Sequence, residues 1–284
     1  MIGLLATPES LGAPIDVAEG LFLRLFGEGL ILRQADAGQT VVAEIHGTLI
    51  KVSFRENKIP PEVLKSSIDG AWYWPEAKAE FDRHKSHIAV VIEDAPEDQL
   101  EDETSGDSAQ NTTEEGTREE TAPPAVDSET ILKRVQKALL LTRVLEVFGE
   151  AHQALGVYWD GAPLVHSWAS FAESASAMKP DHLPLRIWVD YRRWSNVDET
   201  HNLVTRGLEN LGQREIEIHG STHSPSEISA WAYNISHYIL EKGEVLEDRQ
   251  AVGISQTEWI RVFIIESRID KKRWVYYLDL EAEK

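Results

Sequence analysis

The sequence contains no cysteine among its 284 residues, which excludes disulfides, thiolate nucleophiles, zinc ribbons and iron–sulfur clusters. Long apolar runs are missing too, because no run approaches the ~20 residues that a membrane-spanning helix needs. The segment Met1–Thr7 lacks the basic region and the full hydrophobic region of a secretory signal. We therefore expect a cytoplasmic protein that does not bind membranes.

Basic residues are scarce: 28 Lys and Arg stand against 48 Asp and Glu, which gives a formal net charge of −20. A surface of this sign repels phosphate backbones, so binding to nucleic acid is not expected. The protein is instead expected to attract a basic protein partner, because complementary charge raises the rate of encounter.

Thirteen of the acidic residues lie in residues 94–129, where Arg118 is the one basic residue. The stretch has no aromatic side chain, and its large aliphatic side chains are Leu100 and Val126. Burying these two cannot offset the conformational entropy of ordering the whole stretch. The composition predicts a disordered acidic linker over 94–129 between two folded domains, 1–93 and 130–284. The alternative interpretation is a specific acidic decoy for a basic partner.

Common catalytic motifs are also missing. The phosphate-binding Gly-x-x-x-x-Gly-Lys-Ser/Thr loop and the Gly-x-Ser-x-Gly nucleophile elbow are absent, and Gly27-Glu28-Gly29 lacks the third glycine of a dinucleotide loop. Whether the protein is an enzyme stays open, although the sequence favours a non-catalytic protein, and no cofactor is expected.

Secondary-structure patterns in the N-terminal part alternate between strand and helix. They predict strands at residues 2–6 and 87–93, and two more strands within residues 40–56 that are joined by a turn at Gly47. They also predict helices that begin at Pro14, Pro60 and Pro75. This β-α-β-β-α-β order is typical of a ferredoxin-like α+β fold, in which helices cover one face of an antiparallel sheet.

The C-terminal part predicts a second ferredoxin-like or related α/β-sandwich half. Its strongest signal is Ser224-Pro225-Ser226-Glu227, a capping box that opens a helix ending near Gly243. Other patterns predict helices at 130–154 and 166–178, and strands at 157–159, 186–194, 214–219, 259–267 and 273–280. The similar helix starts at Pro61 and Pro225 indicate either an internal duplication or two helices that use the same start chemistry independently.

Several motifs in both parts resemble a bacterial domain-of-unknown-function family, number 4261. The N-terminal motifs are Ile59-Pro60-Pro61-Glu62, Ala71-Trp72-Tyr73-Trp74-Pro75-Glu76-Ala77 and His84-Lys85-Ser86-His87-Ile88-Ala89-Val90-Val91. The C-terminal motifs include Trp188-Val189-Asp190, Thr205-Arg206-Gly207-Leu208 and Glu215-Ile216-Glu217-Ile218. The chain departs from the family near residues 246–253, where Arg249 stands in place of a turn glycine. The resemblance covers both folded parts but not the acidic linker, and it implies no activity or catalytic residues.

The consecutive aromatic residues Trp72, Tyr73 and Trp74 form the first candidate binding surface. Neighbouring side chains on a helix or strand diverge, so at least one of the three should be partly exposed. Exposed Trp and Tyr are favoured anchors in protein interfaces. The alternative is that a kink at Pro75 lets two rings enter the core while Tyr73 exposes only its hydroxyl.

A second candidate lies on the predicted strand at 186–194, where Trp188, Asp190 and Arg192 share one face with Trp194. An acid beside an arginine among aromatic rings is typical of a polar anchor in a pocket, to which Arg206 could add anion binding. The alternative is a salt-bridged strand face with an ordinary surface arginine in the following turn.

Four histidines are the weak candidates for a metal site: His84 and His87 are three residues apart, and His219 and His223 four apart. The plainer interpretation is that no metal binds, that His84 caps a helix C-terminus and that His87 begins a strand.

These observations favour a non-catalytic cytoplasmic binding protein, of the adaptor or immunity type, that contacts another protein through an aromatic-lined surface. The alternative is an enzyme or small-ligand sensor with a pocket around Trp188, Asp190, Arg192 and Arg206. A third possibility is self-assembly through the C-terminal hairpin as a sheet edge, and the oligomeric state stays open.

Overall fold

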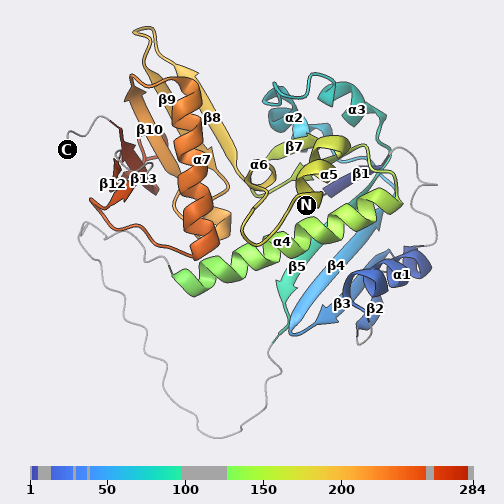
Figure 1. Cartoon of the computed structure of the whole chain (residues 1–284). Helices are drawn as coiled ribbons and strands as arrows, with labels where there is room; N and C mark the ends of the chain where they lie inside the picture. The colour runs from blue at the N-terminus through green and yellow to red at the C-terminus, as the bar shows by residue number, and fades with distance from the viewer. Residues whose placement is uncertain are drawn as a thin grey trace, which may run out of the picture.

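The computed structural model of the chain describes residues 2–5, 14–27, 30–36, 39–96, 127–253 and 259–280 (Figure 1). They form two β-sheets with helices packed around them, which confirms the α+β class. The first sheet has seven strands, all antiparallel to their neighbours, in the order β2-β3-β4-β5-β1-β6-β7. They are β1 (Ile2–Leu5), β2 (Ile31–Ala35), β3 (Thr40–Ile45), β4 (Thr48–Arg55), β5 (Ser86–Asp94), β6 (Gly156–Trp159) and β7 (Leu164–Ser167).

The first sheet crosses the predicted linker. Its strand β1 pairs with β5 on one side and with β6 on the other, and β6 and β7 come after residue 130. The predicted division into 1–93 and 130–284 therefore does not separate the two sheets. The local patterns identified the strands correctly, but strand partners far apart in sequence leave no local signal.

The ferredoxin-like arrangement is not confirmed. A split β-α-β unit places a strand between two parallel strands that a helix connects. In the first sheet β2, β3, β4 and β5 instead follow one another as an antiparallel meander, and β2 is a strand that the sequence analysis did not predict. Strand β4 alternates between its two faces, with Ile50, Val52 and Phe54 buried on one of them.

The long helix α4 (Ser128–Ala151) lies between the two sheets and contacts β1, β5 and α7 (Figure 1). Asp127 caps it by accepting hydrogen bonds from the backbone N–H groups of Glu129 and Thr130. Its buried side chains, including Val144, Leu145 and Phe148, belong to a core that also contains residues of both sheets. Helix α4 thus shares one hydrophobic core with residues of both sheets.

The predicted acidic linker falls mainly outside the described residues, since 97–126 are not described. Its two ends are part of the fold. Asp94 ends β5 and forms ion pairs with Lys133 and Lys137 of α4, at 3.3 and 2.7 Å. Asp127 begins α4, so both ends of the segment lie on the first sheet or on the helix packed against it.

The second sheet is mixed and has six strands in the order β11-β12-β13-β10-β9-β8. It contains β8 (Asp190–Ser195), β9 (His201–Arg206), β10 (Ile216–Ser221), β11 (Ala251–Gly253), β12 (Trp259–Glu266) and β13 (Trp274–Asp279). The predicted hairpin β12–β13 is present but is not an edge, because β11 pairs with β12 and β10 pairs with β13. The expectation that this hairpin offers a free edge was therefore wrong, and the long edge strand is β8.

Helix α7 (Pro225–Lys242) contacts β8 and β9 and buries Ile228, Ala232, Ile235 and Ile239 in the core. Its capping box is confirmed: the Ser224 hydroxyl accepts from the Glu227 N–H, and the Glu227 carboxylate accepts from the Ser224 N–H. Gly243 ends the helix in the left-handed conformation, as predicted.

Three further helices pack on both sides of β6 and β7. Side chains of α2 (Pro61–Asp69) and α3 (Ala77–Arg83) cluster with Tyr158 and Val165, whereas α5 (Trp168–Ser176) contacts α4. Helix α1 (Pro14–Phe26) contacts α4 and β3. Within the described ranges, no helix combines the length and apolar character that crossing a membrane requires.

The strand predicted over residues 186–194 was wrong in its first half. Residues Leu185–Trp188 form the short helix α6, and the strand begins only at Asp190. Trp188 is fully buried, stacks on Trp159 with ring centroids 6.1 Å apart, and donates a hydrogen bond from Nε1 to Thr142 Oγ1 at 3.0 Å. It is a core residue and not part of a strand face.

Candidate functional site

The three consecutive aromatic residues diverge, as predicted. Trp74 is buried against Phe81, with ring centroids 5.5 Å apart, whereas Trp72 is 76% exposed and Tyr73 is 43% exposed. They lie in a tight turn after α2, in which the N–H of Trp74 donates to the carbonyl of Ala71. Trp74 therefore belongs to the core, and Trp72 and Tyr73 belong to the surface.

The turn lies beside the edge strand β8, more than a hundred residues away in the sequence. The Arg193 guanidinium lies over the Trp72 ring, 5.8 Å from its centroid. Arg193 also donates from Nη1 to the Ser229 hydroxyl at 3.3 Å, which holds it against the start of α7. The turn after α2 and the edge of the second sheet thus form one continuous surface.

Asp190 and Arg192 lie on this surface as an ion pair, with Arg192 Nε 2.5 Å from Asp190 Oδ2. Arg206 is exposed and stands opposite Asp190 in the β8–β9 register, where facing side chains are neighbours. We call the set the Trp72–Arg193 surface; it consists of Trp72, Tyr73, Asp190, Arg192, Arg193 and Arg206.

Tyr73 is the most constrained member of the surface. Burial, together with the negative charge of Asp190, raises the pKa of its hydroxyl to about 12, although a hydrogen bond to the Val165 carbonyl and the charge of Arg192 act in the opposite direction. The hydroxyl donates to that carbonyl at 2.9 Å, and the ring stacks on His166. Tyr73 therefore keeps its hydroxyl protonated and its ring fixed in place, so it offers an aromatic contact surface and does not act as a base.

The pocket predicted around Trp188, Asp190, Arg192 and Arg206 is not formed by these four side chains together. Trp188 points into the core, so the three charged residues lie on the surface without it. Two grooves, of about 360 and 550 Å³, are lined by other residues on α4, α7 and the second sheet.

The four histidines do not converge either, and among the described residues no group of three or more potential ligands is placed to hold a metal ion. His84 ends α3, where it was predicted, with Nδ1 against the Phe81 carbonyl and Nε2 accepting from the Ile59 N–H at 2.9 Å. Burial lowers the pKa of His84, and its Nε2 accepts a hydrogen bond, so His84 ends the helix as a neutral hydrogen-bonding group. His223 packs edge-on against Trp231 near the start of α7.

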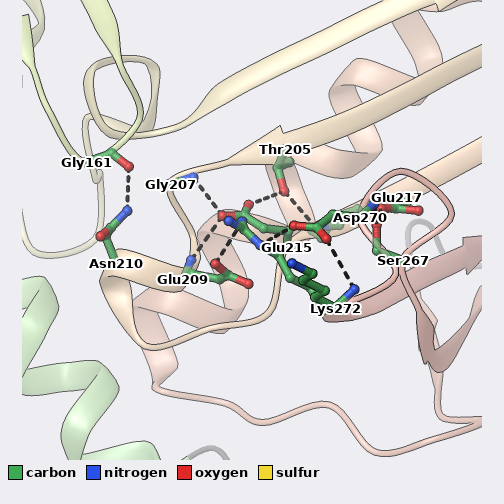
Figure 2. Close-up of polar contacts among 12 residues, drawn as sticks. Gly161, Thr205, Gly207, Glu209, Asn210, Glu215, Glu217, Ser267, Asp270 and Lys272 are labelled. Carbon is green, nitrogen blue, oxygen red and sulfur yellow. Dashed lines mark hydrogen bonds and ion pairs between the residues drawn. The ribbon is translucent and has the colours of Figure 1, made fainter. Parts of the chain in front are cut away.

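Sequence analysis missed a buried carboxylate at the start of β10 (Figure 2). Glu215 accepts hydrogen bonds from Thr205 Oγ1 at 2.7 Å, Gly207 N at 2.7 Å and Glu209 N at 3.2 Å. Burial raises the pKa of Glu215, while these three donors act to lower it. The Glu215 carboxylate therefore holds in place the turn that follows β9.

A second missed group lies two residues further along β10. Glu217 contacts His219 Nε2 at 2.7 Å, and it accepts hydrogen bonds from the Ser267 hydroxyl and from the Arg268 N–H at 3.1 Å. Burial alone would raise the pKa of Glu217, but these partners outweigh it and lower the pKa. Because the Ser267 hydroxyl donates to the carboxylate and not to the imidazole, these residues do not form a serine–histidine nucleophile pair.

The same strands provide the similarity to a known family. Residues 204–277, about a quarter of the chain, match the family described as a domain of unknown function, DUF4261. No curated protein and no solved structure matches the chain. The matched segment contains Arg206, Gly207, Glu215 and Glu217, whereas Trp72 and β8 lie outside it.

Arg249, at the position where the sequence analysis expects a turn glycine, lies inside the matched segment. Its φ is 66°, in the left-handed region that glycine adopts most easily. The turn conformation is therefore the one that a glycine would favour, at a local conformational cost of roughly 1–2 kcal/mol.

Proposed function

We propose that this protein is a non-catalytic binding module of the adaptor or immunity type, which engages another protein through the Trp72–Arg193 surface. The observation that carries this proposal is the position of Trp72, which is 76% exposed and held beside a cation on a different part of the fold. A Trp side chain can bury about 150–250 Å² on contact with a partner. Trp, Tyr and Arg are also the residue types that dominate the binding energy of interfaces.

The geometry also supports a preorganised surface. Tyr73 is fixed by the Val165 carbonyl, Arg193 by Ser229, and Arg192 by Asp190. Side chains already held in place lose less conformational entropy when a partner binds. Three of the surface residues are thus ready for contact without rearrangement.

Charge indicates the chemistry of the contacting segment. The Asp190 carboxylate neutralises Arg192, but within the described ranges Arg193 and Arg206 have no carboxylate within ion-pair distance. The surface is therefore locally positive in a chain of net charge −20. We infer a partner that is basic overall, which favours encounter, and that presents an acidic and apolar segment to this surface.

The test is affinity capture with the full-length protein and three variants, Trp72→Ala, Arg193→Ala and Trp259→Ala. Trp259 is the matched control, because it is 60% exposed but lies on β12, away from β8 in the second sheet. A protein retained by the wild type and by W259A but lost with W72A and R193A is then purified for calorimetry. We expect W72A to weaken its affinity at least ~30-fold, the effect of a hot-spot residue worth about 2 kcal/mol. If W72A and W259A change the set of captured proteins equally, the proposal is wrong.

The proposal includes a cytoplasmic setting and a bacterial origin, and it extends the family resemblance to both folded parts. The extended resemblance is supported by the motifs at 59–62, 71–77 and 84–91, which lie at the start of α2, in the turn that leads into α3 and around the start of β5, all outside the matched segment.

A further inference from the structure

A basic groove lies at the end of the second sheet where β10 and β13 begin. It has a volume of about 550 Å³ and is formed by the first turns of α4, the turn after β9 and the start of β13. Four of its lining residues are cationic: Arg134, Arg214, Lys272 and Arg273. Small-molecule sites typically have volumes of about 300–1,000 Å³.

The two carboxylates in the groove are already engaged. Glu209 pairs with Arg273 at 3.0 Å, and Asp127 accepts hydrogen bonds from Thr130 and Glu129 as the cap of α4. Hydrogen bonding, mainly from the Thr130 hydroxyl and N–H, lowers the pKa of Asp127 and keeps it ionised. Asp127 keeps its negative charge because these partners are neutral, so two carboxylates stand against the four cations of the groove and two positive charges are left uncompensated.

The positive charge left over is held by Lys272 and Arg134. Arg134 donates from Nη1 to the Glu209 carbonyl at 3.0 Å, a neutral partner, and within the described ranges the Lys272 ammonium has no carboxylate within ion-pair distance. Arg214 adds a buried guanidinium that lies over the Tyr276 ring at 5.5 Å. In a chain of net charge −20, a concentration of cations around one groove is best explained by an anionic ligand.

We propose that this groove binds the phosphate ester of a small molecule, with the phosphate between Arg134 and Lys272. Guanidinium and ammonium groups together match the several acceptor oxygens of a phosphate dianion. Trp274 also lines the groove, and its ring provides a flat surface for a planar group of the same ligand. The class that fits both features is a nucleoside monophosphate.

The experiment is calorimetry on the full-length protein with three probes: AMP, ribose 5-phosphate and adenosine. We expect AMP to bind most tightly, ribose 5-phosphate more weakly, and adenosine not to saturate, and we expect added salt to weaken binding. Equal affinities for AMP and ribose 5-phosphate overturn the contact with Trp274. Saturable binding of adenosine as tight as that of AMP overturns the phosphate site.

Matched variants locate the binding. Lys272→Ala and Arg134→Ala each remove one charge-assisted hydrogen bond and should weaken AMP binding roughly tenfold or more. Lys271→Ala is the control, because it removes a neighbouring lysine that does not line the groove. Thermal unfolding of each variant checks that the fold is intact. Absence of AMP binding to the wild type, or equal weakening by K271A and K272A, overturns the proposal.

Discussion

His166 allows a quantitative prediction of how stability depends on pH. It lies on β7, in the first sheet, and its ring stacks on Tyr73 with centroids 6.2 Å apart. Burial lowers the pKa of its imidazole from 6.5 to about 4, although a backbone hydrogen bond to Ile187 acts in the opposite direction. The folded protein therefore holds His166 neutral under conditions in which the unfolded chain binds a proton.

The sign follows from the proton balance. Between pH 6.5 and about 4 the unfolded state binds more protons at His166 than the folded state does, so the free energy of unfolding falls as the pH is lowered. With these two pKa values, this one residue removes about 1.4 kcal/mol between pH 7.5 and 5.5. His84, which is buried, and His87, which is partly buried, have pKa values that burial also lowers, so they act in the same direction.

The assay is urea unfolding of the wild type and of His166→Asn at both pH values, followed by tryptophan fluorescence. H166N should lose about 1.4 kcal/mol of the pH dependence, whatever its stability at pH 7.5. Tyr73→Phe is the control, because it removes the hydrogen bond to Val165 but leaves the imidazole in place, so its pH dependence should equal that of the wild type. If H166N retained the full wild-type pH dependence, burial of His166 would not be the cause.

Two further substitutions, Gly207→Ala and Thr142→Val, test the packing that supports the surface, and Gly220→Ala is the control for the first. Gly207→Ala should destabilise the protein by roughly 2–3 kcal/mol in urea unfolding, because φ is 116° and an added Cβ would lie 2.4 Å from the Trp188 carbonyl oxygen. Gly220→Ala, with φ 65° and open space around the Cβ, should cost only about 1–2 kcal/mol; equal losses would contradict the steric argument. Thr142→Val should cost about 1–3 kcal/mol by leaving the buried Trp188 indole N–H without an acceptor, and a neutral effect would show that another acceptor replaces the hydroxyl.

Short-range signals in the sequence predicted much of the secondary structure. The capping box at Ser224 and the end of α7 at Gly243 depend on contacts within a few residues, and both are present. The strand predicted at residues 186–189 was wrong for a local reason as well. Alternation over so short an apolar run does not distinguish a strand from a turn of helix, and Leu185–Trp188 form a helix whose side chains enter the core.

The candidate surface could be predicted only in part. Three consecutive aromatic residues implied that at least one is exposed, and Trp72 is. Its position beside Arg193 depends on tertiary packing between segments more than a hundred residues apart, which no local pattern encodes. Glu215 was missed for a similar reason. A charged residue in a strand is expected to face the solvent, and the hydrogen-bond donors that allow Glu215 to be buried, Thr205 and Gly207, are known only from the structure.

The pairing of β1 between β5 and β6 has a consequence for how the chain can be divided. A protease that cut within residues 97–126 would produce two fragments that still share a sheet, a core and the ion pairs of Asp94 with α4. Such fragments should stay associated and separate only on denaturation. Neither one, expressed by itself, would contain a complete first sheet, so pieces made from this gene should be chosen to keep β1, β5 and β6 together.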